Sequence, residues 1–377
     1  MKVLHVGKFF PPAIGGIENF LSDLVKWQVR SGIEICVLAH DHKVLRRTQI
    51  SRTAEGFSLI RLATLGSFAY VPVAPSFPVM AYKIMKTWKP DLVHLHLPNA
   101  SAFCFLAFAH RASLVIHWHS DVVPSKHDRK LAMLYRFYKP WETALLRKAK
   151  VVIATSPPYL ESSATLKPFR DKCVIVPLGV DPARLEQFSP FPAIHSRNGR
   201  LMVFTVGRFS YYKGFQYLIK SVTYSNNFFV VIAGDGPLRR NLMKLRDRLN
   251  LRGRVFFTGK LGIGQLNTLL NGCDIFCLPS IERTEAFGLV LLEAMYFAKP
   301  LLTTSIPGSG VSWVNENGVT GLCVPPGSAE AIGAAVNELD VHEEVRNFFG
   351  RNGSKRFNRC FHIARVSEEI GSVYEAI

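Results

Sequence analysis

Short apolar runs rich in β-branched residues recur along the whole chain and alternate with segments that have the apolar spacing of helices. Each run is predicted to be a strand, and the runs fall at residues 2–6, 34–39, 92–96, 114–118, 151–154, 174–176, 201–206, 228–233, 255–258, 274–278 and 300–303. Strands that alternate with helices form parallel sheets. Because the runs are apolar throughout, helices are expected to cover both faces of each sheet. The pattern therefore predicts an α/β protein with doubly wound parallel sheets.

The alternation is interrupted once, at residues 181–200, which contain three prolines and have no apolar period. A new strand run begins directly afterwards. Chain segments of this composition commonly join two compact domains. We therefore expect two Rossmann-like domains, at residues 1–185 and 186–358, followed by a helical C-terminal segment at residues 359–377.

The composition limits the class of protein further. The chain has 377 residues, of which 48% are hydrophobic, and its 46 Lys and Arg against 28 Asp and Glu give a net charge of +18. This composition is too apolar for a disordered protein. The longest near-continuous apolar stretch, residues 100–109, is shorter than the roughly 20 residues that a membrane-spanning helix needs. The N-terminus lacks the apolar core of a secretory signal. We therefore expect a cytoplasmic protein with free thiols at its seven cysteines.

Polar residues follow several predicted strands, at the edge of a parallel sheet where ligands bind. Gly15 and Gly16 follow the first run and precede an amphipathic helix, where backbone amides could approach an anion. An ordinary turn is the alternative. His117, His119 and Asp121 alternate at the end of a later run, so they point to one side if the strand continues.

A metal site is not predicted at these histidines. A surface histidine pair and a hydrogen-bonded core histidine are the alternatives to a functional role, and no clear further ligand is evident near them. Cys273 and Cys277 likewise lack the second pair or the nearby histidine that a zinc site needs.

Two cations follow the run at residues 201–206 in the second half of the chain. Arg208 and Lys213 flank the loop between this predicted strand and the next helix. A planar guanidinium fork and an ammonium point charge suit the two phosphates of a diphosphate. Solvated surface charges are the alternative.

Two carboxylates lie near the end of the run at residues 274–278. Glu285 precedes a helix that is predicted to start near Phe287 and Gly288, and Glu293 lies two turns inside this helix. Amides at the helix start could bind a phosphate, while the two carboxylates could accept hydrogen bonds from ribose and sugar hydroxyls. The alternatives are a helix-dipole role for Glu285 and a solvated position for Glu293, although the segments LVLL and AMYF on either side of it are apolar.

These motifs together resemble the retaining glycosyltransferases of family 4. The segment EAFGLVLLEAM contains both glutamates, and GR-x4-KG at 207–214 and IAGDGP at 232–237 complete the pattern. Further matching segments cover nearly the whole chain and are GGIE at 15–18, HSD at 119–121, ATSP at 154–157, VPLGVD at 176–181 and NGVTGLCVPPG at 317–327. The resemblance implies the GT-B fold, with two Rossmann-like domains that face a central cleft. The first domain would lie on the acceptor side, the second would bind the nucleotide sugar, and the C-terminal helix would cross back to the first.

The resemblance also implies roles for single residues. Arg208 and Lys213 would hold the donor diphosphate, and Glu285 would orient the donor sugar. His119 would lie beside that sugar and complete the set of predicted catalytic residues. Glu293 would bind the ribose hydroxyls, and the stretch at 259–261 would contact the base. The residues expected to bind the donor are Gly15, Gly16, Asp121, Lys260, Leu261, Phe287, Gly288, Leu289 and Glu293.

Metal-independent transfer is expected because the chain contains no Asp-x-Asp pair. Two cations and a helix terminus could do the work of a metal at the diphosphate. Retention of the anomeric configuration comes from the resemblance alone. Because no carboxylate is an obvious covalent nucleophile, a same-face mechanism with an oxocarbenium-like transition state is expected. A nucleotide-sugar epimerase, a phosphorylase of the same fold and a catalytically silent binding module are the alternatives.

A basic segment at residues 126–150 combines eight Lys and Arg and two acids with several aromatic residues. This mixture is typical of an interfacial helix on anionic lipid. A solvated helix that packs one face on the core is the alternative, and a nucleic-acid partner is disfavoured because no recognised module is present. The predicted membrane residues are Lys126, Arg129, Lys130, Arg136 and Lys139.

The segments HSD, FSYYKG, RTEAFG and SIPGSGVSWV are most similar to bacterial O-antigen mannosyl- and rhamnosyltransferases. The resemblance implies a peripheral enzyme of lipopolysaccharide or polysaccharide biosynthesis at the inner face of the cell membrane. Its acceptor would be a glycan on polyprenyl diphosphate or on the lipid A core. GDP-mannose is the first expectation for the donor, and a UDP-hexose is the alternative. Acceptor contacts are expected in loops of the first domain, such as residues 65–78.

Overall fold

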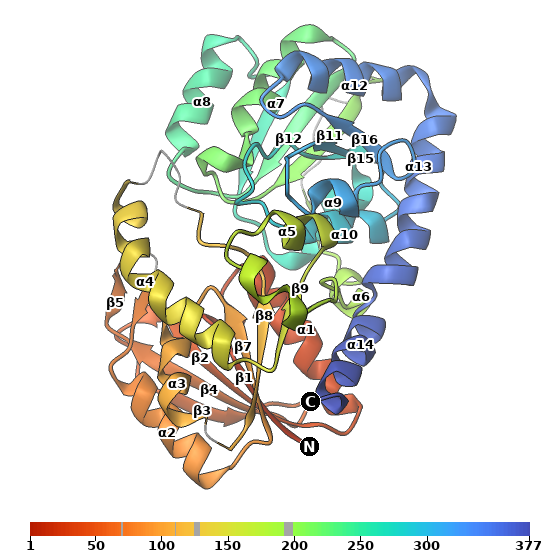
Figure 1. The fold of residues 1–377 in the computed structure, drawn as a ribbon. Coiled ribbons are helices and arrows are strands. Elements are labelled where there is room, and N and C mark those ends of the chain that lie inside the picture. The colour runs from red at the N-terminus through yellow and green to blue at the C-terminus, as the bar shows by residue number, and fades with distance from the viewer. Residues whose placement is uncertain (69–70, 110, 124–128, 192–198) are drawn as a thin grey trace. The chain divides into compact units, whose positions relative to one another are not determined.

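The computed structural model describes residues 1–68, 71–109, 111–123, 129–191 and 199–377, with the side chains of residues 129–131 outside the description. The chain divides into two compact units (Figure 1). The first contains Met1–Gly179 and Ile363–Ile377, and the second contains Val180–His362. The divisions expected from the sequence lie after residues 185 and 358.

The first unit is built on an eight-stranded sheet with the order β10-β9-β8-β7-β1-β2-β4-β3. Its strands are β1 (Lys2–Val6), β2 (Glu34–Val44), β3 (Gln49–Arg52), β4 (Ser58–Thr64), β7 (Leu92–Leu97), β8 (Ser113–Trp118), β9 (Val151–Ala154) and β10 (Cys173–Ile175). The strands are parallel except for β3, which pairs antiparallel with β4 at the edge. A separate two-stranded sheet pairs β5 (Gly66–Phe68) with β6 (Val71–Val73).

The helices of the first unit include one from the C-terminal end of the chain. They are α1 (Gly16–Arg30), α2 (Ser76–Thr87), η1 (Ala100–Cys104), α3 (Phe105–Phe108), α4 (Arg129–Lys148), α5 (Pro157–Ser162), η2 (Lys167–Lys172) and α14 (Ile363–Glu375). α14 packs beside α1 (Figure 1). Its buried Val366, Ile370 and Tyr374 recur at the spacing of one helix face, so this face packs on the unit.

The second unit has a six-stranded sheet with the order β13-β12-β11-β14-β15-β16, and its strand pairs are parallel. The strands are β11 (Leu201–Val206), β12 (Phe228–Ala233), β13 (Val255–Gly259), β14 (Ile275–Leu278), β15 (Leu301–Thr304) and β16 (Gly321–Val324). The helices are α6 (Pro182–Leu185), η3 (Tyr211–Lys213), α7 (Phe215–Ser221), η4 (Val222–Tyr224), α8 (Arg239–Arg248), α9 (Ile263–Gly272), α10 (Leu289–Tyr296), α11 (Val311–Val314), α12 (Ala329–Val341), α13 (Glu343–Arg356) and the π-helix η5 (Phe357–Phe361).

Each predicted strand run is a strand in the structure, and the predicted strands pair in parallel within the two main sheets. In each sheet the strand order reverses once. β1 lies between β2 and β7, and β11 lies between β12 and β14. Loops that leave two neighbouring strands in opposite directions open a crevice at their carboxyl ends, where doubly wound sheets bind ligands. Ligand-binding residues are therefore expected in the loops after β1, β7, β11 and β14.

In the parts of the chain that the structure describes, none of the helices combines the length and the apolar character needed to cross a membrane.

Candidate functional site

The reversal point of the second sheet brings a lysine and a glutamate together that are far apart in the sequence. Lys213 ends η3 after β11, and Glu285 lies in the loop after β14. The Lys213 Nζ atom donates to Glu285 Oε2 at 2.6 Å. Ser280 Oγ donates to the same oxygen at 2.9 Å, and Glu285 is 9% exposed. The two predicted catalytic residues thus form one nearly buried ion pair.

The position of Lys213 depends on the glycine that follows it. Gly214 has a positive φ of 66°, and a Cβ atom there would lie 2.0 Å from the carbonyl oxygen of Pro279. The loop after β11 therefore approaches the loop after β14 as closely as only glycine permits. Ile281 N–H also donates to the Tyr212 carbonyl at 2.7 Å. These contacts hold the lysine ammonium at the reversal point.

Lys213 is a fixed cation. Burial acts to lower its pKa, but the negative charge of Glu285 and the hydrogen bond to it raise the pKa above the ordinary lysine value. Arg208, on the same loop, has an exposed side chain. The loop after β11 thus offers one cation held by the protein and one that is open to solvent, which together suit a diphosphate.

Glu293 is nearly buried on α10, so a solvated position for it is wrong. It is 5% exposed, and its Oε1 atom lies 2.9 Å from Nη1 of Arg184, a residue of α6. Arg184 was not predicted, because a single arginine in the segment VDPARL has no spacing that points to a carboxylate far along the chain. A ribose bound to Glu293 would share this carboxylate with the guanidinium.

The helix after β14 begins one residue later than predicted. α10 starts at Leu289, and its N-cap Gly288 has a φ of 79°. The first amides of a helix have no intrahelical acceptor, so the amides at this start can face a phosphate. The Phe287 ring packs near Trp313 and Phe361, with centroids 6.3 and 6.1 Å away. Only the main chain of Phe287 is thus available to a ligand.

Lys260 and Leu261 follow β13, at the edge of the second sheet and one strand removed from β11. The Lys260 side chain is exposed. A ligand that contacts both this loop and Lys213 would extend across the end of β12, as a nucleotide base and its diphosphate could.

In the first unit, Gly15 and Gly16 lie at the start of α1, as predicted. A Cβ atom on Gly15 would lie 2.0 Å from Oε2 of Glu18, so the glycine makes room for this carboxylate. Burial raises the pKa of Glu18, with the attraction of Lys8 acting in the opposite direction. The sequence did not predict that Glu18 lies next to the amides at which an anion is expected.

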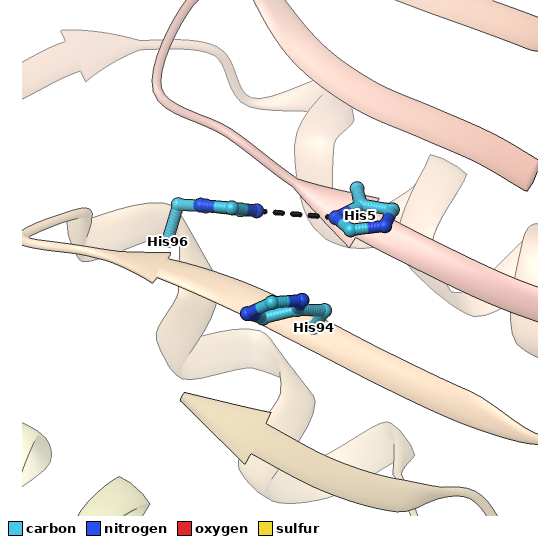
Figure 2. A group of neighbouring side chains, drawn as sticks. All are labelled: His5, His94 and His96. Carbon is cyan, nitrogen blue, oxygen red and sulfur yellow. Dashed lines mark hydrogen bonds between the residues drawn. The ribbon is translucent and has the colours of Figure 1, made fainter. Parts of the chain in front are cut away.

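His117 and His119 are buried, so a surface histidine pair is wrong. Their rings are parallel to within 3°, with centroids 4.4 Å apart. They adjoin His94 and His96 of the neighbouring strand β7. These two rings in turn adjoin His5 of β1 (Figure 2). All five rings are at most 3% exposed, and burial lowers the pKa of each.

Further candidate ligands thus lie near His117 and His119, and the expectation that none does is wrong. Among the described residues, the nitrogen atoms of His5, His94 and His96 lie within 4.8 Å of one another, and so do those of His96, His117 and His119. One ion, however, cannot lie in the planes of two parallel stacked rings at once, as His117 and His119 would require. The absence of a metal from the reaction stays a prediction.

Asp121 does not join the histidines, because β8 ends at Trp118. Only a strand that continued to residue 121 would have placed Asp121 on the histidine side. Instead its Oδ1 atom accepts hydrogen bonds from Trp118 Nε1 at 2.8 Å and from Ser163 Oγ at 2.7 Å. Trp118 lies between the two histidines in sequence, so its side chain points to the opposite face.

α4 presents an apolar and basic surface to solvent. Met133, Phe137 and Trp141 are 60%, 72% and 56% exposed and recur every four residues, and the side chains of Arg136 and Lys139 are exposed as well. Of the other predicted membrane residues, Lys126 lies outside the described residues, and Arg129 and Lys130 start the helix without described side chains.

A largely apolar pocket of about 380 Å³ lies in the first unit, partly within the residues expected to contact the acceptor. It is lined by Pro72, Val73, Ala74, Pro75, Phe77, Pro78, Ala100, Ser101 and Cys104.

The two units define a glycosyltransferase of the GT-B class. Residues 14–184 match the model of Glycosyltransferase Family 4, and residues 189–356 match that of Glycosyl transferases group 1. The chain is 31% identical to O-antigen chain mannosyltransferase C of Escherichia coli, over 100% of this chain and 99% of that protein. It is 29% identical to D-rhamnosyltransferase WbpZ of Pseudomonas aeruginosa, over 96% and 92%. The fold matches that of a sucrose-phosphate synthase from Thermosynechococcus elongatus with a TM-score of 0.80, at 20% identity over 100% and 98% of the two chains. The chain therefore belongs to glycosyltransferase family 4 and is a hexosyltransferase, as its motifs indicated.

Proposed function

We propose that the protein transfers a hexose, with retention and without a metal ion, from a nucleotide diphosphate sugar to a lipid-linked glycan of bacterial surface polysaccharide. The observation that carries this proposal is the buried pair of Lys213 and Glu285 at the reversal point of the second sheet. A fixed cation at this position can neutralise a leaving diphosphate, and a carboxylate beside it can accept hydrogen bonds from sugar hydroxyls.

The donor would occupy the strand ends of the second unit. Lys213 and Arg208 hold the diphosphate, and the amides at the start of α10 add hydrogen bonds to it. Glu285 orients the sugar, and Glu293 binds the ribose while Arg184 keeps this carboxylate in place. His119, which ends the first unit's histidine group, contacts the donor sugar.

The chemical step proceeds on one face of the sugar. The bond between the anomeric carbon and the diphosphate oxygen breaks, and the oxygen leaves with the electron pair. The acceptor hydroxyl forms its new bond to the same face of the anomeric carbon and gives its proton to the leaving phosphate. Lys213 and Arg208 stabilise the negative charge that develops on the diphosphate.

GDP-mannose is the proposed donor, because the two relatives described above are named as an O-antigen chain mannosyltransferase and a D-rhamnosyltransferase. A thermal-shift panel of GDP, UDP, ADP and their common sugar conjugates, with EDTA present, tests this. A ligand at 100 times its Kd stabilises the folded state by about 2.7 kcal/mol, which raises Tm by several degrees. We expect a selective shift with GDP and GDP-mannose.

A selective shift with UDP would replace the donor with a UDP-hexose and leave the chemistry unchanged. If no nucleotide shifts Tm until magnesium or manganese replaces EDTA, the proposal of metal independence is wrong. If none shifts it under either condition, the assignment of the donor site is wrong.

The acceptor is proposed to be carried on a lipid at the inner face of the cell membrane, with α4 lying on the anionic surface. The exposed Met133, Phe137 and Trp141 would enter the interface, and the exposed Arg136 and Lys139 would contact lipid phosphates. The apolar pocket at residues 72–78 is the proposed region of acceptor contact.

Replacing Arg136 and Lys139 together by glutamine is expected to weaken binding to vesicles that contain anionic lipid. Each basic residue near such a surface contributes about 1 kcal/mol, so the double variant should bind about 10- to 30-fold more weakly. Co-sedimentation with vesicles at low and moderate salt measures this. The matched control replaces the exposed Lys220 and Arg351 of the second unit. Equal losses in both double variants would show that net charge, rather than α4, determines the binding.

A further inference from the structure

A chain of hydrogen bonds crosses one face of the first unit's sheet, from α1 to the residue after β8. Gln28 Oε1 lies 2.8 Å from His5 Nε2, and His5 Nδ1 lies 3.1 Å from His96 Nε2 (Figure 2). His96 Nδ1 lies 2.9 Å from His119 Nε2. Each member is at most 3% exposed. The chain therefore links Gln28 to the proposed sugar-contacting histidine through two other rings.

These contacts have the character of hydrogen bonds between neutral rings. The facing nitrogen atoms of neighbouring rings are 2.9 and 3.1 Å apart, and Gln28 Oε1 lies 2.8 Å from His5 Nε2. All three distances are hydrogen-bond lengths. Burial lowers the pKa of His5 to about 4 and that of His119 to about 3, and the pKa of His96 is lowered in the same direction. A neutral imidazole has one N–H donor and one nitrogen acceptor. A ring that accepts a hydrogen bond at one nitrogen must therefore donate from the other.

Gln28 determines which atom donates in each hydrogen bond of this chain. Gln28 Nε2 faces the Tyr374 hydroxyl at 3.2 Å, which leaves the amide oxygen toward His5. An amide oxygen can only accept, so His5 carries its proton on Nε2 and accepts at Nδ1. His96 must then donate from Nε2 and accept at Nδ1. His119 must donate from Nε2, which leaves its Nδ1 without a proton.

The unprotonated atom at the end of the chain has no partner. His119 Nδ1 is buried and makes no hydrogen bond among the described residues. Burying an acceptor without a donor is unfavourable, and a ligand hydroxyl that donates to this atom would remove the penalty. A hydroxyl of the donor sugar is such a group.

We propose that Gln28, His5 and His96 are positioning residues that fix the tautomer of His119, so that its Nδ1 lone pair accepts a hydrogen bond from a hydroxyl of the donor sugar. The sugar contact rests on the proposed function, whereas the tautomer is a property of the free protein. A protonated Nδ1 would instead present a donor and would favour a different group on the ligand.

Long-range 15N–1H correlation spectra of the full-length protein, labelled at histidine and kept in EDTA, test the tautomer directly. His119→Gln assigns the signal. We expect His119 to show a single neutral tautomer with a proton on Nε2 and none on Nδ1. Gln28→Leu removes the acceptor that sets the direction, so the signal should be shared between the two tautomers. Gln28→Glu keeps an acceptor at the same place and should restore the single tautomer.

His117→Leu is the matched control. It removes a ring that stacks on His119 at 4.4 Å, but the ring nitrogens of His117 make no hydrogen bond among the described residues. This variant disturbs the packing of His119 more directly than Gln28→Leu does, because Gln28 reaches His119 only through His5 and His96. It should nevertheless leave the tautomer unchanged. If it changes the tautomer as Gln28→Leu does, packing sets the tautomer and the proposal is wrong.

A proton on Nδ1 of His119 in the unaltered protein would overturn the proposal, and so would an unchanged single tautomer in Gln28→Leu. These spectra need no donor and no turnover. If the predicted tautomer is found but no nucleotide sugar is used, the proposed function is wrong and the proposed role of the hydrogen-bond chain is still supported. If transfer is observed with the opposite tautomer, only the proposed role of the hydrogen-bond chain is wrong.

Discussion

Lys213→Ala is expected to lower the turnover number by about 10²- to 10³-fold, the usual loss when one group that stabilises developing charge is removed. The Nζ atom of Lys213 is nearly buried and lies 2.6 Å from Glu285. In the proposed reaction this cation faces the diphosphate as negative charge develops on it. Water cannot replace a fixed ammonium there without reorganising. Initial rates with a saturating nucleotide sugar and a purified lipid-linked acceptor measure the loss.

Two variants separate this effect from damage to the fold. Lys213→Gln keeps most of the side-chain volume and a hydrogen-bond donor for Glu285 but removes the charge, so its turnover should stay near that of the alanine variant. Lys220→Ala removes an exposed lysine of the same unit and should leave turnover unchanged. Turnover within tenfold of the unaltered enzyme in either Lys213 variant, with an unchanged Tm, would rule out the proposed role of Lys213.

Much of the fold could be predicted because strands buried on both faces are apolar throughout. The strands at 151–154, 201–206 and 228–233 have the predicted bounds. The strands that were not predicted are not apolar along their whole length, or are very short. β4 contains Arg61 and alternates partly exposed with buried positions, and β3 is exposed along its length at the sheet edge. β16 has four residues and begins with a glycine.

The meeting of Lys213 and Glu285 could also be predicted, because each follows a parallel strand and neighbouring strands end at the same edge of a sheet. The pairing of Glu293 with Arg184 could not. Arg184 lies on a short helix outside the strand pattern, and its reach to α10 depends on how the helices pack. Sequence spacing holds no information on such a contact.

The histidine group could be predicted only in part. The segments HLH at 94–96 and HWH at 117–119 each place two histidines on one face of a strand, which is a signal that sequence reasoning can use. That the two pairs meet depends on register, since His96 pairs with His117 and His94 pairs with His5. A shift of one residue between the strands would send one pair to the opposite face.

Lowering the pH from 7.5 to 5.5 is expected to lower the Tm of the first unit by about 10 °C or more. Burial lowers the pKa of His5 and His40 to about 4 and of His119 to about 3, and it shifts His94, His96 and His117 the same way. In the unfolded chain each histidine has a pKa near 6.5 and takes up a proton earlier as pH falls. The folded state is therefore not penalised above pH 6.5 and loses stability as the pH falls below it.

The size of this effect follows from the number of buried histidines in the first unit. At pH 5.5 each loses about 1.4 kcal/mol, because the pH is about one unit below the unfolded pKa. The three histidines with pKa values near 3 to 4 together lose about 4 kcal/mol. That sum is a large part of the roughly 5–15 kcal/mol that stabilises a domain, and each kcal/mol shifts Tm by about 2–4 °C. Circular dichroism melts across this pH range measure the shift.

His117→Leu should make the dependence of Tm on pH less steep, because it removes one buried titrating ring that makes no hydrogen bond among the described residues. His342→Gln is the matched control, since the His342 side chain is exposed and belongs to the second unit. It should leave the dependence unchanged. A Tm of the unaltered protein that stays constant between pH 7.5 and 5.5 would mean that the histidine face takes up protons without unfolding. The description of the rings in the proposed hydrogen-bond chain as neutral would then be incorrect.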